Sequence, residues 1–160
     1  MLKGLNYLHS NKNLCHRDLK PDNILVDENF GLKIIDYGFM CRFQGENGSG
    51  VLTSRVGTPE YMAPEIWDKA YSGRAADLFA CGVTLFVMHA GNYPWEAAKK
   101  DDKIYSLLAQ KKYDIFWKVQ EKGNPRVNFS EDFKSLVTMM IEESPQDRVC
   151  MADIIVHPWL

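Results

Sequence analysis

The chain contains 160 residues, of which 46% are hydrophobic and 25% are charged, and its formal net charge is -2. This composition suits one soluble domain, and lysines scattered among acids give no electrostatic basis for binding nucleic acid or an anionic membrane. No stretch approaches the roughly 20 apolar residues of a membrane span, and the first residues make a poor signal peptide, so we expect a cytoplasmic or nuclear protein.

The most informative segment is the run HRDLKPDN, from His16 to Asn23. It places a carboxylate at Asp18, an ammonium group at Lys20 and an amide at Asn23, just before the apolar residues 24–26, which predict a strand. Transfer of a phosphoryl group to a hydroxyl needs an acceptor for the proton, a positive charge on the phosphate oxygens and oxygen ligands for magnesium. Asp18, Lys20 and Asn23 suit these roles in that order.

A second apolar run, residues 32–35, is followed by Asp36-Tyr37-Gly38. Turn-forming residues 27–31 separate the two runs and predict a β-hairpin. Such a hairpin would bring Asp36 beside Asn23, where both side chains could bind one magnesium ion. The alternative is that Asp36 only ends a strand and Asp18 forms an Asx turn, which is the usual role of a loop aspartate.

Three glycines, Gly45, Gly48 and Gly50, follow within residues 44–50. Their spacing is GxxGxG, whereas the phosphate-binding loop of nucleotide enzymes has the spacing GxGxxG. We therefore expect a flexible loop here and not a phosphate-binding one.

Helical patterns begin after Glu65. Residues 74–90 are apolar on nearly every face except at Asp77, which predicts a central buried helix. Asp77 lies near the start of this helix and could simply complement the helix dipole. A later segment has apolar residues at i, i+3, i+4, i+7 and i+8, which predicts an amphipathic helix with Ser130 as its N-cap: Phe133, Leu136, Val137, Met140 and Ile141.

The four cysteines are widely spaced: Cys15, Cys41, Cys81 and Cys150. They form no CxxC pair and have no histidine at zinc-finger distance, so we do not expect them to bind metal. Reduced thiols are the expected state.

The block GTPEYMAPE, from Gly57 to Glu65, completes a set of motifs together with Asp77 and Arg148. With the earlier motifs, this set resembles the eukaryotic protein kinase family. Lys20 and the GTPEYMAPE block are similar to the serine/threonine branch. The closing residues 157–159 resemble the end of the kinase domain in calcium/calmodulin-dependent relatives.

The resemblance covers essentially the whole chain, but only as the C-terminal helical lobe of a kinase. It implies a fold that is mainly α with a small β-hairpin, and a single partial kinase domain over residues 1–160. A kinase also has a GxGxxG loop, a strand lysine and a helix glutamate in an N-terminal β lobe. We find none of these three here, and we expect that lobe in a full-length form.

The resemblance further implies a serine/threonine protein kinase that uses ATP and Mg2+ and has a protein substrate with a Ser or Thr hydroxyl. Asp18 would be the catalytic base, and Lys20 would contact the phosphates. Asn23 and Asp36 would bind the metal and ATP, while Leu25 would pack under adenine.

Other residues would support these groups. In the family, the residue equivalent to Asp77 accepts hydrogen bonds from the catalytic-loop backbone, and the equivalents of Glu65 and Arg148 form a buried ion pair. The equivalent of Thr58 reaches the catalytic aspartate and lysine, although Thr58 could merely shape the turn before a proline.

Ser54 lies four residues before Thr58, and Arg17 is next to the proposed base. A phosphate on Ser54 would form charge-assisted hydrogen bonds with Arg17 and order the segment. Thr53 is a competing site for the same modification.

Two classes of function remain open. One is a serine/threonine kinase, and the other is a non-catalytic, pseudokinase-like interaction module. The four chemical residues Asp18, Lys20, Asn23 and Asp36 are all present, which favours the kinase, because a binding module would be free to lose them. We expect negligible activity from the 160-residue chain alone, since ATP would be held on one side only.

Overall fold

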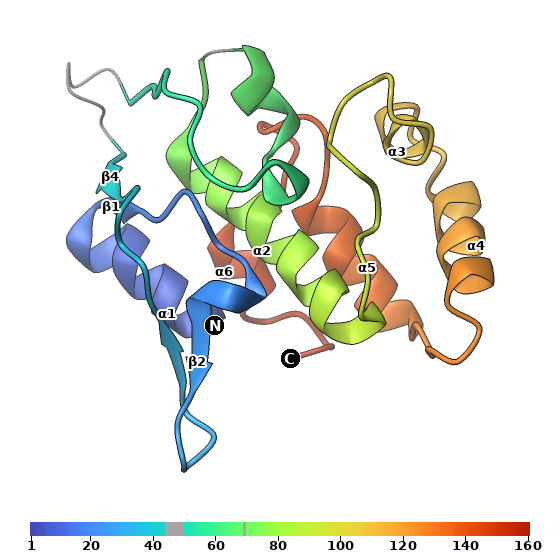
Figure 1. Ribbon diagram of the computed structural model, residues 1–160, viewed down its shortest axis with the longest axis horizontal. Helices are drawn as coiled ribbons and strands as arrows, with labels where there is room; N and C mark the ends of the chain where they lie inside the picture. Colours follow the sequence, from blue (N-terminus) through green and yellow to red (C-terminus); the bar gives the residue numbers. More distant parts are fainter. Residues whose placement is uncertain (44–49, 69) are drawn as a thin grey trace.

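Helix α2 (Gly73–Ala90) runs through the centre of the molecule (Figure 1). It begins one residue before the predicted start, where the side chain of Ser72 accepts a hydrogen bond from the Ala75 amide. It ends at Gly91, which has a φ of 76° and donates to the Val87 carbonyl, as glycine commonly does at a helix end. Eleven of its 18 residues are buried, so the predicted central helix is confirmed.

The computed structural model describes residues 1–43, 50–68 and 70–160. The predicted flexible loop therefore lies mostly outside the described residues, including Gly45 and Gly48. The helices are α1 (Leu2–Tyr7), α2, α3 (Tyr105–Ala109), α4 (Tyr113–Gly123), α5 (Glu131–Met140) and α6 (Met151–Ile154). Short 3-10 turns cover Pro21–Asn23, Pro59–Tyr61 and Pro64–Asp68, and a π-helical turn covers Leu8–Lys12.

Helix α5 packs directly against α2. Its N-cap is Ser130, whose hydroxyl accepts a hydrogen bond of 3.2 Å from the Phe133 amide, and its predicted apolar stripe is buried. A Cβ atom on Gly82 would lie 2.8 Å from the Met140 Cβ, so the absence of a side chain at Gly82 lets the two helices approach closely. The predicted amphipathic helix and its cap are confirmed.

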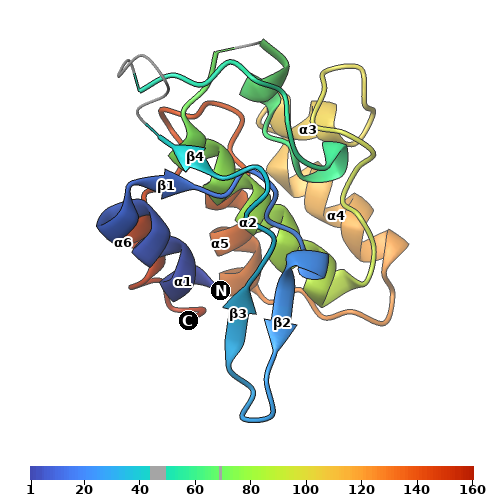
Figure 2. The ribbon, with the colours of Figure 1, turned by 60° about the vertical axis from the view of Figure 1, so that its left-hand side comes forward.

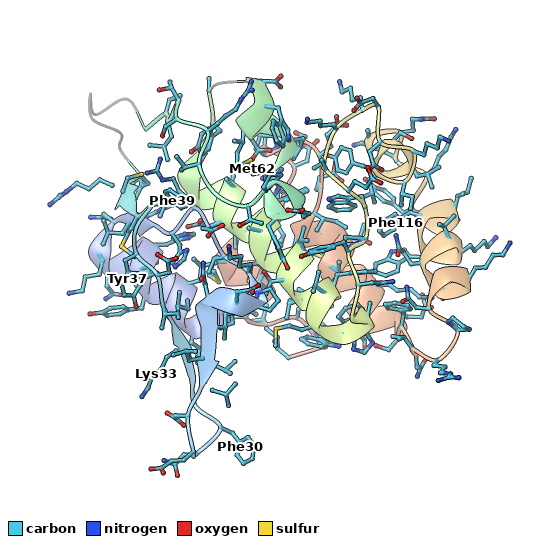
Figure 3. All side chains as sticks on the ribbon, viewed as in Figure 1. Phe30, Lys33, Tyr37, Phe39, Met62 and Phe116 are labelled. Atoms are coloured by element: carbon cyan, nitrogen blue, oxygen red, sulfur yellow. The ribbon has the colours of Figure 1, made fainter. Side chains whose placement is uncertain are left out.

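The predicted hairpin is also confirmed, with strands β2 (Ile24–Val26) and β3 (Leu32–Ile34). Ile24 pairs with Ile34 and Val26 pairs with Leu32 in the antiparallel register. The side chain of Asp27 closes the turn by accepting hydrogen bonds from the amides of residues 29 and 31. The hairpin projects from the helical body, with Phe30 at its tip (Figure 3).

A second two-stranded sheet pairs β1 (Leu14–Cys15) with β4 (Cys41–Arg42), which lie side by side in Figure 2. This sheet is not predicted by the sequence, because two-residue strands are too short for an alternating pattern to be detected. The fold is therefore mainly α with two small antiparallel sheets, and the predicted fold class is confirmed. Within the described part of the chain, no helix combines the length and apolar character needed to cross a membrane.

Candidate active site

The carboxylate of Asp18 is the centre of a buried hydrogen-bonded group. Asp18 lies on the loop between β1 and the 3-10 turn Pro21–Asn23, and it is 5% exposed. Its oxygens accept a hydrogen bond of 2.7 Å from the Thr58 hydroxyl and one of 3.1 Å from the Asn23 amide, and Lys20 Nζ lies 3.2 Å away. Burial by itself raises the pKa of the Asp18 carboxyl, but hydrogen bonds from Thr58, Lys20 and Asn23 outweigh burial and lower the pKa below its usual value.

Thr58 links the carboxylate of Asp18 to the ammonium group of Lys20. Its hydroxyl donates to Asp18 and accepts a hydrogen bond of 2.8 Å from Lys20 Nζ. The preceding residue, Gly57, has a φ of 109°, and a Cβ atom there would overlap the carbonyl oxygen of Arg17. Only glycine allows this close approach, which brings the GTPEYMAPE segment onto the His16–Asn23 loop.

Asn23 and Asp36 are brought together by the hairpin. The Asn23 carbonyl accepts a hydrogen bond of 2.9 Å from the Ile35 amide, so Asp36 is the next residue beyond this pairing. The His16 ring contacts the Ile35 carbonyl at 3.0 Å and adds a second tie between loop and hairpin. Asp36 is exposed, with a φ of 60°, and its side chain accepts a hydrogen bond of 3.2 Å from the Gly38 amide.

The side-chain oxygens of Asn23 and Asp36 suit a hard cation such as Mg2+ that is held by few protein ligands. Among the described residues, no group of three or more His, Cys, Asp and Glu side chains is placed to hold a metal ion. Asp36 and Asn23 together offer one carboxylate and one amide. Mg2+ is commonly bound in this way, by one or two side chains that leave its other positions to phosphates and water.

The side chain of Asp77 supports the loop from beneath. Asp77 is 0% exposed, and its two oxygens accept hydrogen bonds of 2.8 Å from the amides of His16 and Arg17. The ring of His9 contacts the same carboxylate at 2.8 Å. Because these donors satisfy the buried charge, Asp77 acts as a fixed anchor and does more than complement the helix dipole.

The role of His9 is not among the sequence-based predictions. A detectable signal exists, since His9 follows Leu2 and Leu5 at positions i+7 and i+4, on the buried face of the first helical segment. A histidine in such a stripe needs a buried polar partner, and only the folded structure identifies that partner as Asp77.

Glu65 and Arg148 form a bidentate ion pair with distances of 2.6 and 2.9 Å. The Arg148 guanidinium also donates to the carbonyls of Ala75 at 2.8 Å and Glu142 at 2.8 Å. Its side chain is 1% exposed, so this arginine joins the GTPEYMAPE segment, α2 and the segment after α5.

Three further predicted residues lie at the edge of the site: Arg17, Ser54 and Leu25. Arg17 Nη1 donates to the Ser54 hydroxyl at 2.7 Å, and its Nε donates to the Phe39 carbonyl at 2.5 Å. Leu25 lies on β2, opposite Lys33, and is 51% exposed. The structure therefore connects most of the predicted polar residues by hydrogen bonds around the loop that carries Asp18: Arg17, Asp18, Lys20, Asn23, Ser54, Thr58 and Asp77. Asp36 lies next to Ile35, which pairs with Asn23. Glu65 and Arg148 form a separate pair that is joined to α2, and Leu25 lies on the open face of the hairpin.

Comparison with known proteins agrees with this geometry. A family model described as protein kinase domain matches residues 1–160, and the chain belongs to the protein kinase family. It is 38% identical over 160 residues to the serine/threonine-protein kinase chk1 of Schizosaccharomyces pombe, covering 100% of this chain and 31% of that protein. It is 35% identical over 159 residues to the serine/threonine-protein kinase grp of Drosophila melanogaster, covering 99% of this chain and 30% of that protein.

A plant relative gives the same result. The CBL-interacting serine/threonine-protein kinase 14 of Arabidopsis thaliana is 33% identical over 160 residues, which cover 99% of this chain and 34% of that protein. The chain thus spans about a third of the length of the curated relatives it matches. The similarity to the serine/threonine branch of the family is confirmed by these relatives.

The Glu65→Gln variant tests the buried ion pair. We expect it to lower the free energy of unfolding by about 3–5 kcal/mol, because Arg148 would remain buried without its counter-charge. Urea unfolding followed by circular dichroism measures this change. The control is Lys100→Gln, which removes an exposed pair with Glu143 and should cost less than about 1 kcal/mol. Equal and small effects in the two variants would contradict the expectation.

The Thr58→Val variant tests the hydrogen bonds to Asp18. Loss of the hydroxyl should raise the pKa of Asp18 toward its usual value, as measured by carboxyl carbon NMR. In wild type, the Thr58–Asp18 hydrogen bond should contribute about 1.5–3 kcal/mol to the free energy of unfolding, as is typical of a hydrogen bond to a charged group, at pH values above the unfolded-state pKa of about 3.9. It should disappear as the pH falls through the lower folded-state pKa. Thr53→Val, at an exposed position, should leave the pKa of Asp18 unchanged, and an equal rise there would refute the assignment.

Proposed function

We propose that this chain is the catalytic lobe of a serine/threonine protein kinase, which transfers the γ-phosphoryl group of ATP to a Ser or Thr hydroxyl of a protein. The observation that carries the proposal is the pair of hydrogen bonds at Thr58, which donates to Asp18 at 2.7 Å and accepts from Lys20 at 2.8 Å. A hydroxyl thus lies between a carboxylate and an ammonium group. A substrate hydroxyl that attacks a phosphate needs the same two neighbours.

Asp18 would orient the substrate hydroxyl and receive its proton. Its lowered pKa keeps the carboxylate ionised and makes it a weak base. A weak base is sufficient, because the transition state for phosphoryl transfer is loose and the hydroxyl proton leaves late. The contribution of Asp18 is therefore mainly its position, which is held by Asn23 and by the backbone amides bound to Asp77.

Lys20 would stabilise the charge on the transferred phosphoryl group. Its Nζ lies 3.2 Å from Asp18 and is partly exposed, with 24% of the side chain accessible. The ammonium group can therefore contact a phosphate oxygen while it stays close to the proposed base. This arrangement places positive charge beside the reacting atoms, where it lowers the barrier most.

Asn23 and Asp36 would hold Mg2+, and Leu25 would contact the adenine ring of ATP. When bound, magnesium supplies positive charge that neutralises the phosphate oxygens. The residues of this chain contribute the oxygen ligands and their spacing, which the pairing of Ile35 with Asn23 supports.

We also propose that transfer requires an N-terminal lobe in the full-length protein, and that the 160-residue chain alone has negligible activity. Apolar side chains are exposed along the hairpin, at Leu25 (51%), Val26 (60%) and Leu32 (45%). Exposed apolar groups in such a cluster fit a surface that another part of a protein covers. We expect the full-length protein in the cytoplasm or nucleus.

The Asp18→Asn variant of the full-length protein tests the proposed function. We expect the rate of phosphate transfer from radiolabelled ATP to a Ser-containing or Thr-containing protein to fall about 10²–10⁴-fold, because a neutral amide neither orients the substrate hydroxyl with a negative charge nor receives its proton. The control is Asp114→Asn, an exposed acid on α4. Retention of the normal rate by Asp18→Asn would contradict the proposal. Absence of transfer by a folded full-length wild type would favour the non-catalytic interaction module.

A phosphate on Ser54 would strengthen a contact that already exists. The Ser54 hydroxyl accepts a hydrogen bond of 2.7 Å from Arg17 Nη1, and the Ser54 carbonyl accepts one of 2.9 Å from the Tyr71 hydroxyl. Phosphorylation would add a charge of about -1.5 to -2 at this point and replace a neutral hydrogen bond by charge-assisted ones. We propose that this change fixes the GTPEYMAPE segment against the loop that carries Asp18.

The Ser54→Ala variant tests this regulation in the full-length protein after treatment with an activating kinase extract. Loss of the phosphate site should lower the rate of phosphate transfer about 5–150-fold, the range of a typical regulatory coupling. Thr53→Ala is the matched control, and mass spectrometry should locate the phosphate on Ser54. Unchanged activity in Ser54→Ala would exclude the proposed regulation.

A further inference from the structure

The small β1–β4 sheet places two cysteines directly opposite each other. Cys15 on β1 pairs with Cys41 on β4 in an antiparallel register. Residues that face each other across an antiparallel pair project from the same side of the sheet. The two thiols, which are 26 positions apart in the sequence, are therefore neighbours in the fold.

The hydrogen bonding of the sheet determines the type of this pair. The Phe43 amide donates to the Asn13 carbonyl at 3.3 Å, which marks residues 13 and 43 as a hydrogen-bonded pair. Such pairs alternate along an antiparallel ladder, so Cys15 and Cys41 form the next one, with a Cα separation of about 5.5 Å. A disulfide needs a Cα separation of about 4.4–6.8 Å, which this register satisfies, and a Cβ separation of about 3.5–4.5 Å. The Cβ atoms of a hydrogen-bonded pair are about 5.5 Å apart, so the two short strands must move slightly together, and the resulting strain makes the bond easier to reduce.

The two thiols have similar surroundings, which leave little thiolate at neutral pH and make their reaction with an oxidant slow. Burial raises the pKa of both thiols, and both also experience the charges of Asp77 and Arg17. Both cysteines are free thiols, as are Cys81 within α2 and Cys150 before α6. Neither of the other two cysteines belongs to a strand.

The two thiols differ in their access to solvent. Cys15 is 0% exposed, and its sulfur packs against Gly73 at the start of α2. Cys41 is partly exposed on β4. An oxidant in solution therefore reaches Cys41 first, and Cys15 is the nearby thiol that can respond.

We propose that Cys15 and Cys41 are a site of reversible oxidation, at which a peroxide forms a disulfide that ties β1 to β4. In the first step, the Cys41 sulfur attacks hydrogen peroxide, the O–O bond breaks, and a sulfenic acid and water form. In the second step, the Cys15 sulfur attacks the Cys41 sulfur, the S–O bond breaks, and the hydroxyl leaves as water with the thiol proton. Two thiols are oxidised, and one peroxide is reduced to two waters.

The position of this bond gives it a consequence that is independent of the proposed function. β1 leads directly into His16, and β4 begins three residues after Gly38. A covalent link between them restrains the start of the loop that carries Asp18 relative to the segment that follows Asp36. Oxidation therefore makes this junction more rigid, and a thiol reductant releases it.

The test is oxidation of the full-length protein with hydrogen peroxide, alkylation of the remaining thiols, and tryptic digestion without reductant. We expect peptide 13–17 joined to peptide 34–42, with a mass two hydrogens below their sum, and disappearance of this species after reduction. The Cys41→Ser variant should lose the linked species, and the Cys150→Ser control should retain it. A link from Cys15 to another cysteine, or a sulfinic acid at Cys41 with Cys15 still alkylated, would overturn the proposal.

A second measurement tests the restraint itself. Native-state hydrogen exchange, read by mass spectrometry, should slow at the Phe43 amide after oxidation and recover after reduction. Wild type should show this protection, whereas Cys41→Ser should exchange at one rate under both conditions. Unchanged exchange in a sample whose linked peptides are present would refute the proposed rigid junction.

Discussion

The burial of one carboxylate, Asp77, is the constraint on which the rest of the site depends. A fully buried charge is stable only when several donors satisfy it, and here the amides of His16 and Arg17 and the ring of His9 do so. Arg17 adopts a φ of 68°, which a residue with a side chain rarely tolerates without support. The carboxylate thus holds the backbone in an unfavourable conformation immediately before Asp18, and the side chain of Asp18 is positioned as a result.

Helix α2 carries Asp77 and connects it to the GTPEYMAPE segment, which contains Thr58 and Glu65. Thr84 lies two turns after Asp77 on the same helix. Its hydroxyl donates to the Ala80 carbonyl and also contacts the Leu19 carbonyl, on the loop that carries Asp18, at 3.3 Å. At the first turn of α2, the Ala75 carbonyl accepts a hydrogen bond from Arg148, which also binds Glu65. The loop with Asp18 and the segment with Thr58 are therefore fixed to the same helix, and their relative position follows from its rigidity.

The parts of the fold that a periodic pattern specifies could be predicted from the sequence. The hairpin followed from two apolar runs around a turn, and α5 followed from its apolar stripe and its serine cap. Most polar residues of the site were found because they lie in contiguous motifs. The β1–β4 sheet and the role of His9 could not be predicted, because each depends on a partner more than 20 residues away. The two-residue strands have no local pattern, and the apolar stripe that contains His9 does not identify Asp77 as its partner.

The hairpin has a consequence for handling the 160-residue chain in isolation. In the described part of the chain it is a two-stranded sheet, so the outer edges of β2 and β3 both lack a neighbouring strand. Unpaired backbone groups next to apolar side chains can accept a strand from another molecule. Phe30, at the tip, is 87% exposed and would add to this tendency (Figure 3). Concentrated preparations of the chain should therefore self-associate through the hairpin edges, and charged substitutions there would improve solubility.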